Sequence, residues 1–187
     1  MDERKWIERI LAGDTQSFSC LVAKYEKMAY TIALRILENC EEAEEAVQDA
    51  FVKMYRALSD FHFDSKFSTW FYRIVYRTAL TALRQQRMFV SYEEAGPVDL
   101  SNDEVESATA LLEREDRKEM IARTLKKLPA DEALLLTLYY LEECSVEEIC
   151  QITELSASNV KVKLFRGRKR FYEVLQDKMK LETADLL

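Results

Sequence analysis

The residues best suited to chemistry lie in a basic stretch near the C-terminus. Between Ser156 and Arg170 the chain has six Lys and Arg residues and no Asp or Glu. At ~100° per residue, one arc of a helix over this stretch is apolar and the next is basic. The apolar arc holds Val160, Leu164, Gly167, Phe171, Val174 and Leu175. The basic arc holds Asn159, Lys163, Arg166 and Arg170, extended by Lys169. This separation suits a helix that reads phosphates and base edges in the major groove of DNA.

The segment before this basic helix supports that reading. Ser145 and Glu148 have the spacing of a capping box, which predicts a short helix ending near Thr153. A turn at residues 154–156 then leads into a helix over residues 157–178. Two helices joined by a tight turn form a helix-turn-helix pattern. A solvated amphipathic helix with no ligand remains the alternative.

A second cationic face is predicted on a helix over residues 66–87. Between Arg73 and Arg87 there are four Arg and no acid, and four of the eight residues from Lys66 to Arg73 are aromatic. Cations that follow a phosphate backbone, beside rings that receive unstacked bases, favour single-stranded DNA binding. Phe71 is expected in the core. For Phe67 and Trp70, a core position and a stacking position both remain open.

The composition limits the class of protein. The 187 residues include only 3 Gly and 2 Pro, which argues against a turn-rich β fold. With one histidine and no CxxC pair among the four cysteines, neither a metal site nor a cofactor is expected. No apolar run approaches the ~18 residues of a membrane span, and the first residues lack a signal-peptide pattern. We expect a soluble, cytoplasmic, all-α protein without enzymatic activity.

The charge distribution predicts two domains. The net charge of −7 lies in residues 88–120, which hold 3 basic and 10 acidic residues, together with Gly96 and Pro97. This composition is typical of a linker. We therefore expect two small helical domains, residues 1–87 and 108–187, joined by an acidic linker at 88–107, with the helix-turn-helix in the second domain.

Helical spacing and capping signals place the other elements. The expected helices are residues 2–12, a helix capped by Asp14, one opened by an Asn39–Glu42 capping box, one from Ser101 to about Lys127, and residues 130–141. The third of these carries an acidic flank.

Three segments, in order along the chain, resemble the extracytoplasmic-function (ECF) type of bacterial RNA polymerase sigma factor. Residues 42–51 (EAEEAVQDAF) resemble a conserved segment of that family, and residues 67–74 (FSTWFYRI) resemble its promoter-melting helix. The stretch from Leu128-Pro129 through residues 145–149 (SVEEI) to residues 159–169 (NVKVKLFRGRK) resembles its −35-binding domain.

The resemblance implies partners and a role for each region. One face of the N-terminal domain is expected on the β′ clamp helices of core RNA polymerase: Glu45, Gln48 and Asp49. The −10 element of promoter DNA would be recognised and melted by His62, Phe63, Lys66, Phe67, Trp70, Arg73, Arg77, Thr81 and Arg84. The −35 element would be read by Ser158, Asn159, Lys161, Lys163, Phe165, Arg166, Lys169 and Arg170. The C-terminal domain would also lean on the β flap. An anti-sigma factor is a further implied partner, and membrane insertion is not expected.

The sequence departs from the family pattern at three positions. Arg77 replaces a usual Asn, and Thr81 replaces a usual Asp, so the DNA-facing side becomes more positive. Glu154 replaces the usual Gly of the helix-turn-helix turn, which predicts slight strain if that position requires a positive φ.

Two other functions remain open. A stand-alone helix-turn-helix regulator would need dimer symmetry to read paired half-sites, and it would not bind core polymerase. An adaptor that binds only protein would show no steep dependence of DNA binding on salt.

Overall fold

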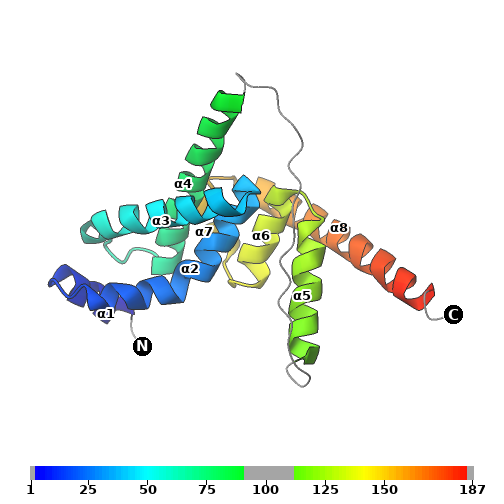
Figure 1. The fold of residues 1–187 in the computed structure, drawn as a ribbon, viewed down its shortest axis with the longest axis horizontal. Helices are drawn as coiled ribbons and strands as arrows, with labels where there is room; N and C mark the ends of the chain where they lie inside the picture. The colour runs from blue at the N-terminus through cyan, green and yellow to red at the C-terminus, as the bar shows by residue number, and fades with distance from the viewer. Residues whose placement is uncertain (1–2, 91–111, 185–187) are drawn as a thin grey trace. The chain divides into compact units, whose positions relative to one another are not determined.

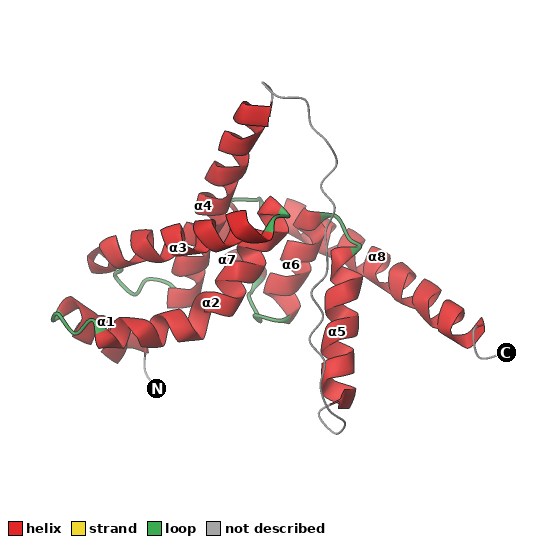
Figure 2. Cartoon of the chain, viewed as in Figure 1, coloured by secondary structure: helices red, strands yellow, loops and turns green. Residues whose placement is uncertain are grey.

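The computed structural model describes residues 3–90 and 112–184, and every regular element in these ranges is a helix (Figure 1, Figure 2). The prediction of an all-α fold is therefore confirmed. The elements are α1 (Glu3–Leu11), α2 (Gln16–Leu37), α3 (Cys40–Arg56), the 3-10 turn η1 (Leu58–Asp60), α4 (Phe67–Val90), α5 (Leu112–Lys126), α6 (Ala130–Tyr140), α7 (Val146–Thr153) and α8 (Ala157–Ala184). Helices α4 and α8 extend further than predicted, to residues 90 and 184. The expected linker at 88–107 and the Ser101 capping box fall mostly or wholly outside the described residues.

Local capping signals set several of the helix boundaries. Asn39 Oδ1 accepts a hydrogen bond from the Glu42 backbone N–H at 3.1 Å and caps α3, while the Glu42 carboxylate accepts one from Gln86 instead of closing the box. At α7, both hydrogen bonds of the Ser145–Glu148 capping box are present. Asp14 Oδ1 accepts from the Gln16 backbone N–H at 3.0 Å, so this side chain does serve the start of α2.

The helices form two packed units. The first contains α1 to α4, η1 and α7, and the second contains α5, α6 and α8.

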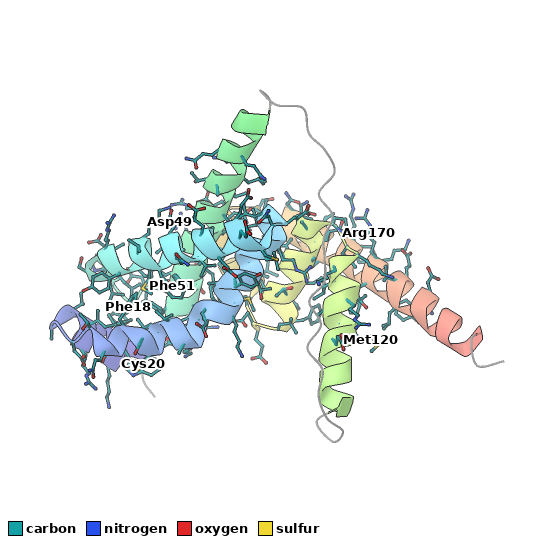
Figure 3. All side chains as sticks on the ribbon, viewed as in Figure 1. Phe18, Cys20, Asp49, Phe51, Met120 and Arg170 are labelled. Atoms are coloured by element: carbon teal, nitrogen blue, oxygen red, sulfur yellow. The ribbon has the colours of Figure 1, made fainter. Side chains whose placement is uncertain are left out.

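The core of the first unit lies where α2, α3 and α4 pack on one another. It is rich in rings: Phe71 and Tyr72 of α4 are almost fully buried, and both contact Tyr25 of α2. Phe18 of α2 and Phe51 of α3 point toward each other (Figure 3), with ring centroids 6.4 Å apart. The core fixes the direction of α4 and therefore of its basic face.

The second unit depends on a close approach between α6 and α8. A Cβ at Gly167 of α8 would lie 3.2 Å from Leu136 Cδ1 and 3.3 Å from Glu132 Cβ, both in α6. The sequence predicted this close approach from the position of Gly167 in the apolar stripe. Val160 and Leu164 of that stripe are buried as well.

Candidate nucleic-acid interface

The cationic face predicted on α4 is present. Arg73, Arg77 and Arg84 are exposed, with the exposed Thr81 between them. The Thr81 hydroxyl donates to the Arg77 carbonyl oxygen at 2.8 Å, one helical turn earlier. Among the described residues, no acid lies within ion-pairing distance of Arg84. Within the described residues, the Arg84 end of this face therefore presents unneutralised positive charge.

An aromatic cluster lies beneath the N-terminal end of that face. Phe67 is only 3% exposed and contacts the rings of Tyr25, Phe61 and Trp70. Its ring cannot stack on a base without leaving the core. Phe71 is fully buried, as expected. Trp70 is half-buried, with one side against Phe61 at a centroid distance of 5.1 Å.

The loop before α4 presents two of the predicted residues to solvent. His62 is exposed, and the Phe63 side chain is 41% exposed. Phe63 has φ +62°, a left-handed conformation that is unusual for a bulky residue. Its ring lies 4.7 Å from the ring of Phe61, and the Arg4 guanidinium lies 4.9 Å from its centroid. These contacts hold an exposed aromatic ring in a strained backbone conformation.

Glu148 of α7 and Glu154, the residue that follows α7, pair with the N-terminal part of the α4 face. Glu148 Oε1 lies 2.9 Å from Lys66 Nζ. Glu154 Oε1 accepts a hydrogen bond from Arg77 Nε at 2.9 Å and one from Arg73 Nη2 at 3.3 Å. The sequence does not indicate these acids as partners, because no local pattern links residues so far apart in the chain.

The surroundings of both acids lower their carboxyl pKa values. For Glu154, the hydrogen bond from Arg77 is the main cause, and Arg73 adds to it. For Glu148, desolvation raises the pKa, but hydrogen bonds from Ser145 and Lys66 outweigh it, and the net shift is downward. Both groups are thus held as carboxylates beside the α4 cations.

The acidic flank predicted on α3 is exposed. Glu45, Gln48 and Asp49 all face solvent, and Asp49 is marked on α3 in Figure 3. Ala46 and Ala50 on the opposite side of the helix are buried. The flank is therefore a surface available to a partner, with Lys53 Nζ 3.9 Å from Asp49 as its neighbouring cation.

The predicted −35 residues separate into two groups on α8. The first group is exposed: Ser158, Asn159, Lys161, Phe165, Arg166 and Lys169. Phe165 is 64% exposed, although it is a large apolar side chain. Among the described residues, no acid pairs with Lys161 or Arg166, so these two cations are available to a ligand.

The second group is Lys163 and Arg170, which pair with acids of α6. Lys163 Nζ bonds to Asp131, and Arg170 Nη1 lies 3.0 Å from Glu132 Oε1. Desolvation raises the pKa of Asp131, but the hydrogen bonds from Lys163 and from the Glu132 backbone outweigh it, so the net shift is downward. The Glu132 side chain is only 7% exposed. These two cations therefore bind α8 to α6.

An apolar groove of about 400 Å³ lies between α5, α6 and α8. Its walls include Leu136 and Tyr140 of α6 and Phe171, Tyr172 and Leu175 of α8. Tyr140 and Tyr172 are 52% and 61% exposed, so the groove has a wide aromatic rim.

The described ranges contain neither a cluster of metal ligands nor a membrane-spanning helix. No group of three or more His, Cys, Asp or Glu side chains is arranged to hold a metal ion there. No helix in those ranges is long and apolar enough to span a membrane.

The sequence is similar to known sigma factors over nearly its whole length. The family profile of Sigma-70 region 2 matches residues 21–88, and that of Sigma-70 region 4 matches residues 118–171. The RNA polymerase sigma-H factor of Pseudomonas aeruginosa is 32% identical over 181 residues, which cover 93% of this chain and 94% of that protein. The ECF RNA polymerase sigma-E factor of Escherichia coli K12 is 31% identical over 170 residues, covering 87% and 88% of the two chains.

Solved structures share the fold at lower identity. The sigma factor RpoE of Bartonella quintana, solved in complex with the anti-sigma factor NepR, has a TM-score of 0.70 at 18% identity. That match covers 86% of this chain and 98% of the other. CnrH, solved in complex with the cytosolic domain of CnrY, has a TM-score of 0.61 at 21% identity, covering 93% and 97% of the chains.

Proposed function

The chain belongs to the ECF group of sigma-70 RNA polymerase sigma factors, and from this premise we propose which of its surfaces meet polymerase and promoter DNA. The family predicted from sequence is thereby confirmed, and the comparisons do not favour a stand-alone helix-turn-helix regulator. We propose a role in binding and specificity, in which core polymerase supplies the catalytic centre.

The α3 flank is the proposed contact with the β′ clamp helices. Glu45, Gln48 and Asp49 are exposed on one side of a helix whose other side is fixed in the core. Fixed, exposed charges steer a partner of opposite charge and set the docking register.

The proposed −10 surface combines α4 with the loop before it. The residues proposed are His62, Phe63, Lys66, Trp70, Arg73, Arg77, Thr81 and Arg84. We leave out Phe67 because its ring is buried among other rings. The exposed Phe63 suits an extruded base, since stacking offsets the few kcal/mol that unstacking costs. Its positive φ is the kind of local strain that clusters at binding sites.

The proposed −35 surface is the exposed group on α8. Arg166 and Lys161 supply cations that no acid of the described ranges pairs with, Asn159 supplies an amide, and Phe165 supplies an apolar contact for a thymine methyl group. We assign Lys163 and Arg170 mainly to holding α8 in place, because each already pairs with an acid of α6.

The groove of the second unit is the proposed seat of the β flap. Its apolar walls and aromatic rim suit an apolar helix or loop, because burying exposed Tyr and Phe surface favours association. We keep the division into residues 1–87, 88–107 and 108–187 as part of this proposal. A cytoplasmic location and control by an anti-sigma factor also belong to it; the RpoE and CnrH complexes support the latter only through a shared fold.

One observation carries the proposal: the chain presents two cationic helical faces, on α4 and on α8, in two separately packed units. A protein that binds two promoter elements requires two such faces. The test is transcription by cognate core polymerase on fragmented genomic DNA, with mapping of RNA 5′ ends. New starts that share two upstream elements are expected, and the absence of new starts with active core would contradict the proposal.

Matched variants assign the two faces. At a promoter that matches both elements, Arg84→Ala should lower the transcript yield about tenfold by weakening binding to the downstream element. Arg166→Ala should lower it by a similar factor by weakening binding to the upstream element. Neither substitution strands an acid among the described residues. Glu26→Gln, an exposed charge change on α2, is the control and should leave the yield unchanged.

A further inference from the structure

Helix α7 lies along the side of α4 that we propose for the −10 element. Lys66 pairs with Glu148, and Arg73 and Arg77 pair with Glu154. Three of the basic residues proposed to bind DNA thus have carboxylate partners from the first helix of the helix-turn-helix.

The contact between α7 and α4 extends along the basic face of α4. Positions 66, 73 and 77 are separated by close to whole helical turns, so they share one side of α4 and span roughly 16 Å at 1.5 Å per residue. Their partners rise in the same order, from Glu148 to Glu154, so α7 runs in the same direction as α4. A single adventitious ion pair would not fix such a register.

The docked helix is held by more than charge. Ile149 and Ile152 of α7 are fully buried, and Thr69, on the same side of α4 as Lys66 and Arg73, is 2% exposed. Exposed ion pairs contribute little by themselves because water and salt screen them. Apolar burial therefore supplies most of the docking energy, and the three ion pairs select the face on which α7 docks.

The carboxylates of α7 stand where phosphates would bind. The carboxylates of Glu148 and Glu154 neutralise the Lys and Arg side chains with which they pair, and α7 occupies the side of α4 along which a phosphate backbone would run. We infer that the free chain is self-inhibited, with α7 acting as an acidic cover over the −10 face of α4, and that this cover must leave before the DNA strand can bind. This inference rests on the proposed function, since it concerns the same α4 face.

The cover also explains why one helix can serve as a switch. In a helix-turn-helix, the first helix supports the recognition helix and crosses the DNA backbone. While α7 lies on α4, it occupies the −10 face. Its release frees that face and makes α7 available to the −35 reader in one step.

The experiment uses the full chain without polymerase. Glu148→Gln combined with Glu154→Gln removes both carboxylate charges, while Gln at 148 can still close the capping box. Glu26→Gln combined with Glu147→Gln removes the same net charge from exposed positions and is the matched control. Two quantities are measured: hydrogen exchange of the α7 amides, and binding of a fluorescein-labelled single-stranded oligodeoxythymidine of about 16 nucleotides.

We expect the exchange rate of the α7 amides and the affinity for the oligonucleotide to rise together. In the Glu148/Glu154 variant, α7 should exchange faster and the oligonucleotide should bind at least about fivefold tighter, the lower end of usual coupling between two equilibria. The control should behave like the unchanged chain. Faster exchange without tighter binding, unchanged exchange, or equal tightening in both double variants would each overturn the inference.

These readouts separate the inference from the proposed function. Neither measurement involves polymerase or a promoter, so a failure to find new transcription starts would leave the cover intact. Conversely, new transcription starts together with unchanged hydrogen exchange of α7 in the Glu148/Glu154 variant would support the proposed function and overturn the inference that α7 covers α4.

Discussion

Arg77 Nε lies 2.9 Å from Glu154 Oε1, so the chain brings together two positions at which its sequence departs from the sigma-factor pattern. By the family resemblance, Arg77 stands where an Asn is usual and Glu154 where a Gly is usual. Glu154 has φ +63° and ψ +14°, so this turn does require the left-handed conformation that Gly adopts without cost. The two departures thus have one structural role in common, the contact between α4 and α7.

The turn itself provides the first prediction. Glu154→Ala removes the carboxylate but keeps a Cβ at positive φ, whereas Glu154→Gly removes both. The glycine variant should therefore be more stable than the alanine variant by about 1 kcal/mol, the cost of a left-handed residue with a Cβ. Thermal unfolding followed by circular dichroism measures the difference. Equal stabilities would show that the turn relaxes away from positive φ once the carboxylate is lost.

The contact should also depend on pH. The carboxyl pKa of Glu154 is lowered from the ordinary value of 4.5, mainly by the hydrogen bond from Arg77 and further by Arg73. For Glu148, desolvation raises the pKa, but the hydrogen bonds from Ser145 and then Lys66 outweigh it, so its pKa is also below 4.5. A lowered carboxyl pKa means that the contribution of these carboxylates to docking is fully present above pH 4.5 and is lost as pH falls through the lowered values.

The test is hydrogen exchange of the α7 amides, measured at neutral pH and at pH values below 4.5 and corrected for the intrinsic exchange rates. Protection should fall on the acid side while α2 remains protected. The Glu148→Gln/Glu154→Gln chain is the control and should show no such step. Protection that persists at acid pH in the unchanged chain would mean that apolar packing alone orders α7.

The sequence predicted those features that depend on nearby residues. Asn39 and Ser145 were identified as caps because a capping side chain acts within three residues, and both hydrogen bonds are present. Gly167 was identified as a point of close approach because it lies in an apolar stripe. The helical periodicity of apolar residues predicted that these segments are helices. The ends of α4 and α8 differ from the prediction because the apolar pattern defines the ends of a helix less well than its middle.

The features that the sequence did not predict are those that depend on distant residues. Nothing in the periodicity around Glu148 or Glu154 indicates that α4 is their partner. Likewise, Lys163 and Arg170 lie on the predicted basic arc, and only the packing of α6 shows that Asp131 and Glu132 neutralise them. The assignment of individual residues to promoter bases stays a prediction.

The pair Arg170–Glu132 leads to a third prediction. Glu132 Oε2 is buried without a hydrogen-bond partner among the described residues, and Oε1 depends on Arg170. Arg170→Ala leaves the whole carboxylate unpaired, and the free energy of unfolding should fall by about 1–3 kcal/mol. Arg166→Ala, which strands no acid in the described structure, should change stability by less than about 0.5 kcal/mol.

A second substitution separates the cause from general damage. Adding Glu132→Gln to Arg170→Ala removes the stranded charge and should restore part of the lost stability, as measured by urea unfolding. If Arg166→Ala destabilises as much as Arg170→Ala, the ion pair with Glu132 is not what holds α8 on α6.

The contact between α6 and α8 at Gly167 provides the last prediction. Alanine there would gain about 1 kcal/mol in helix propensity over glycine, but its Cβ would lie 3.2 Å from Leu136 Cδ1 and 3.3 Å from Glu132 Cβ. The Leu136 methyl group can move, whereas Glu132 Cβ is fixed to the backbone of α6, so the two effects should nearly cancel. Valine adds two methyl groups to the same space, so Gly167→Val should lower the free energy of unfolding by about 1–3 kcal/mol through overpacking. Gly167→Ala is the reference at the same position, and a Gly167→Val chain as stable as Gly167→Ala would show that α6 and α8 are not closely packed at this point.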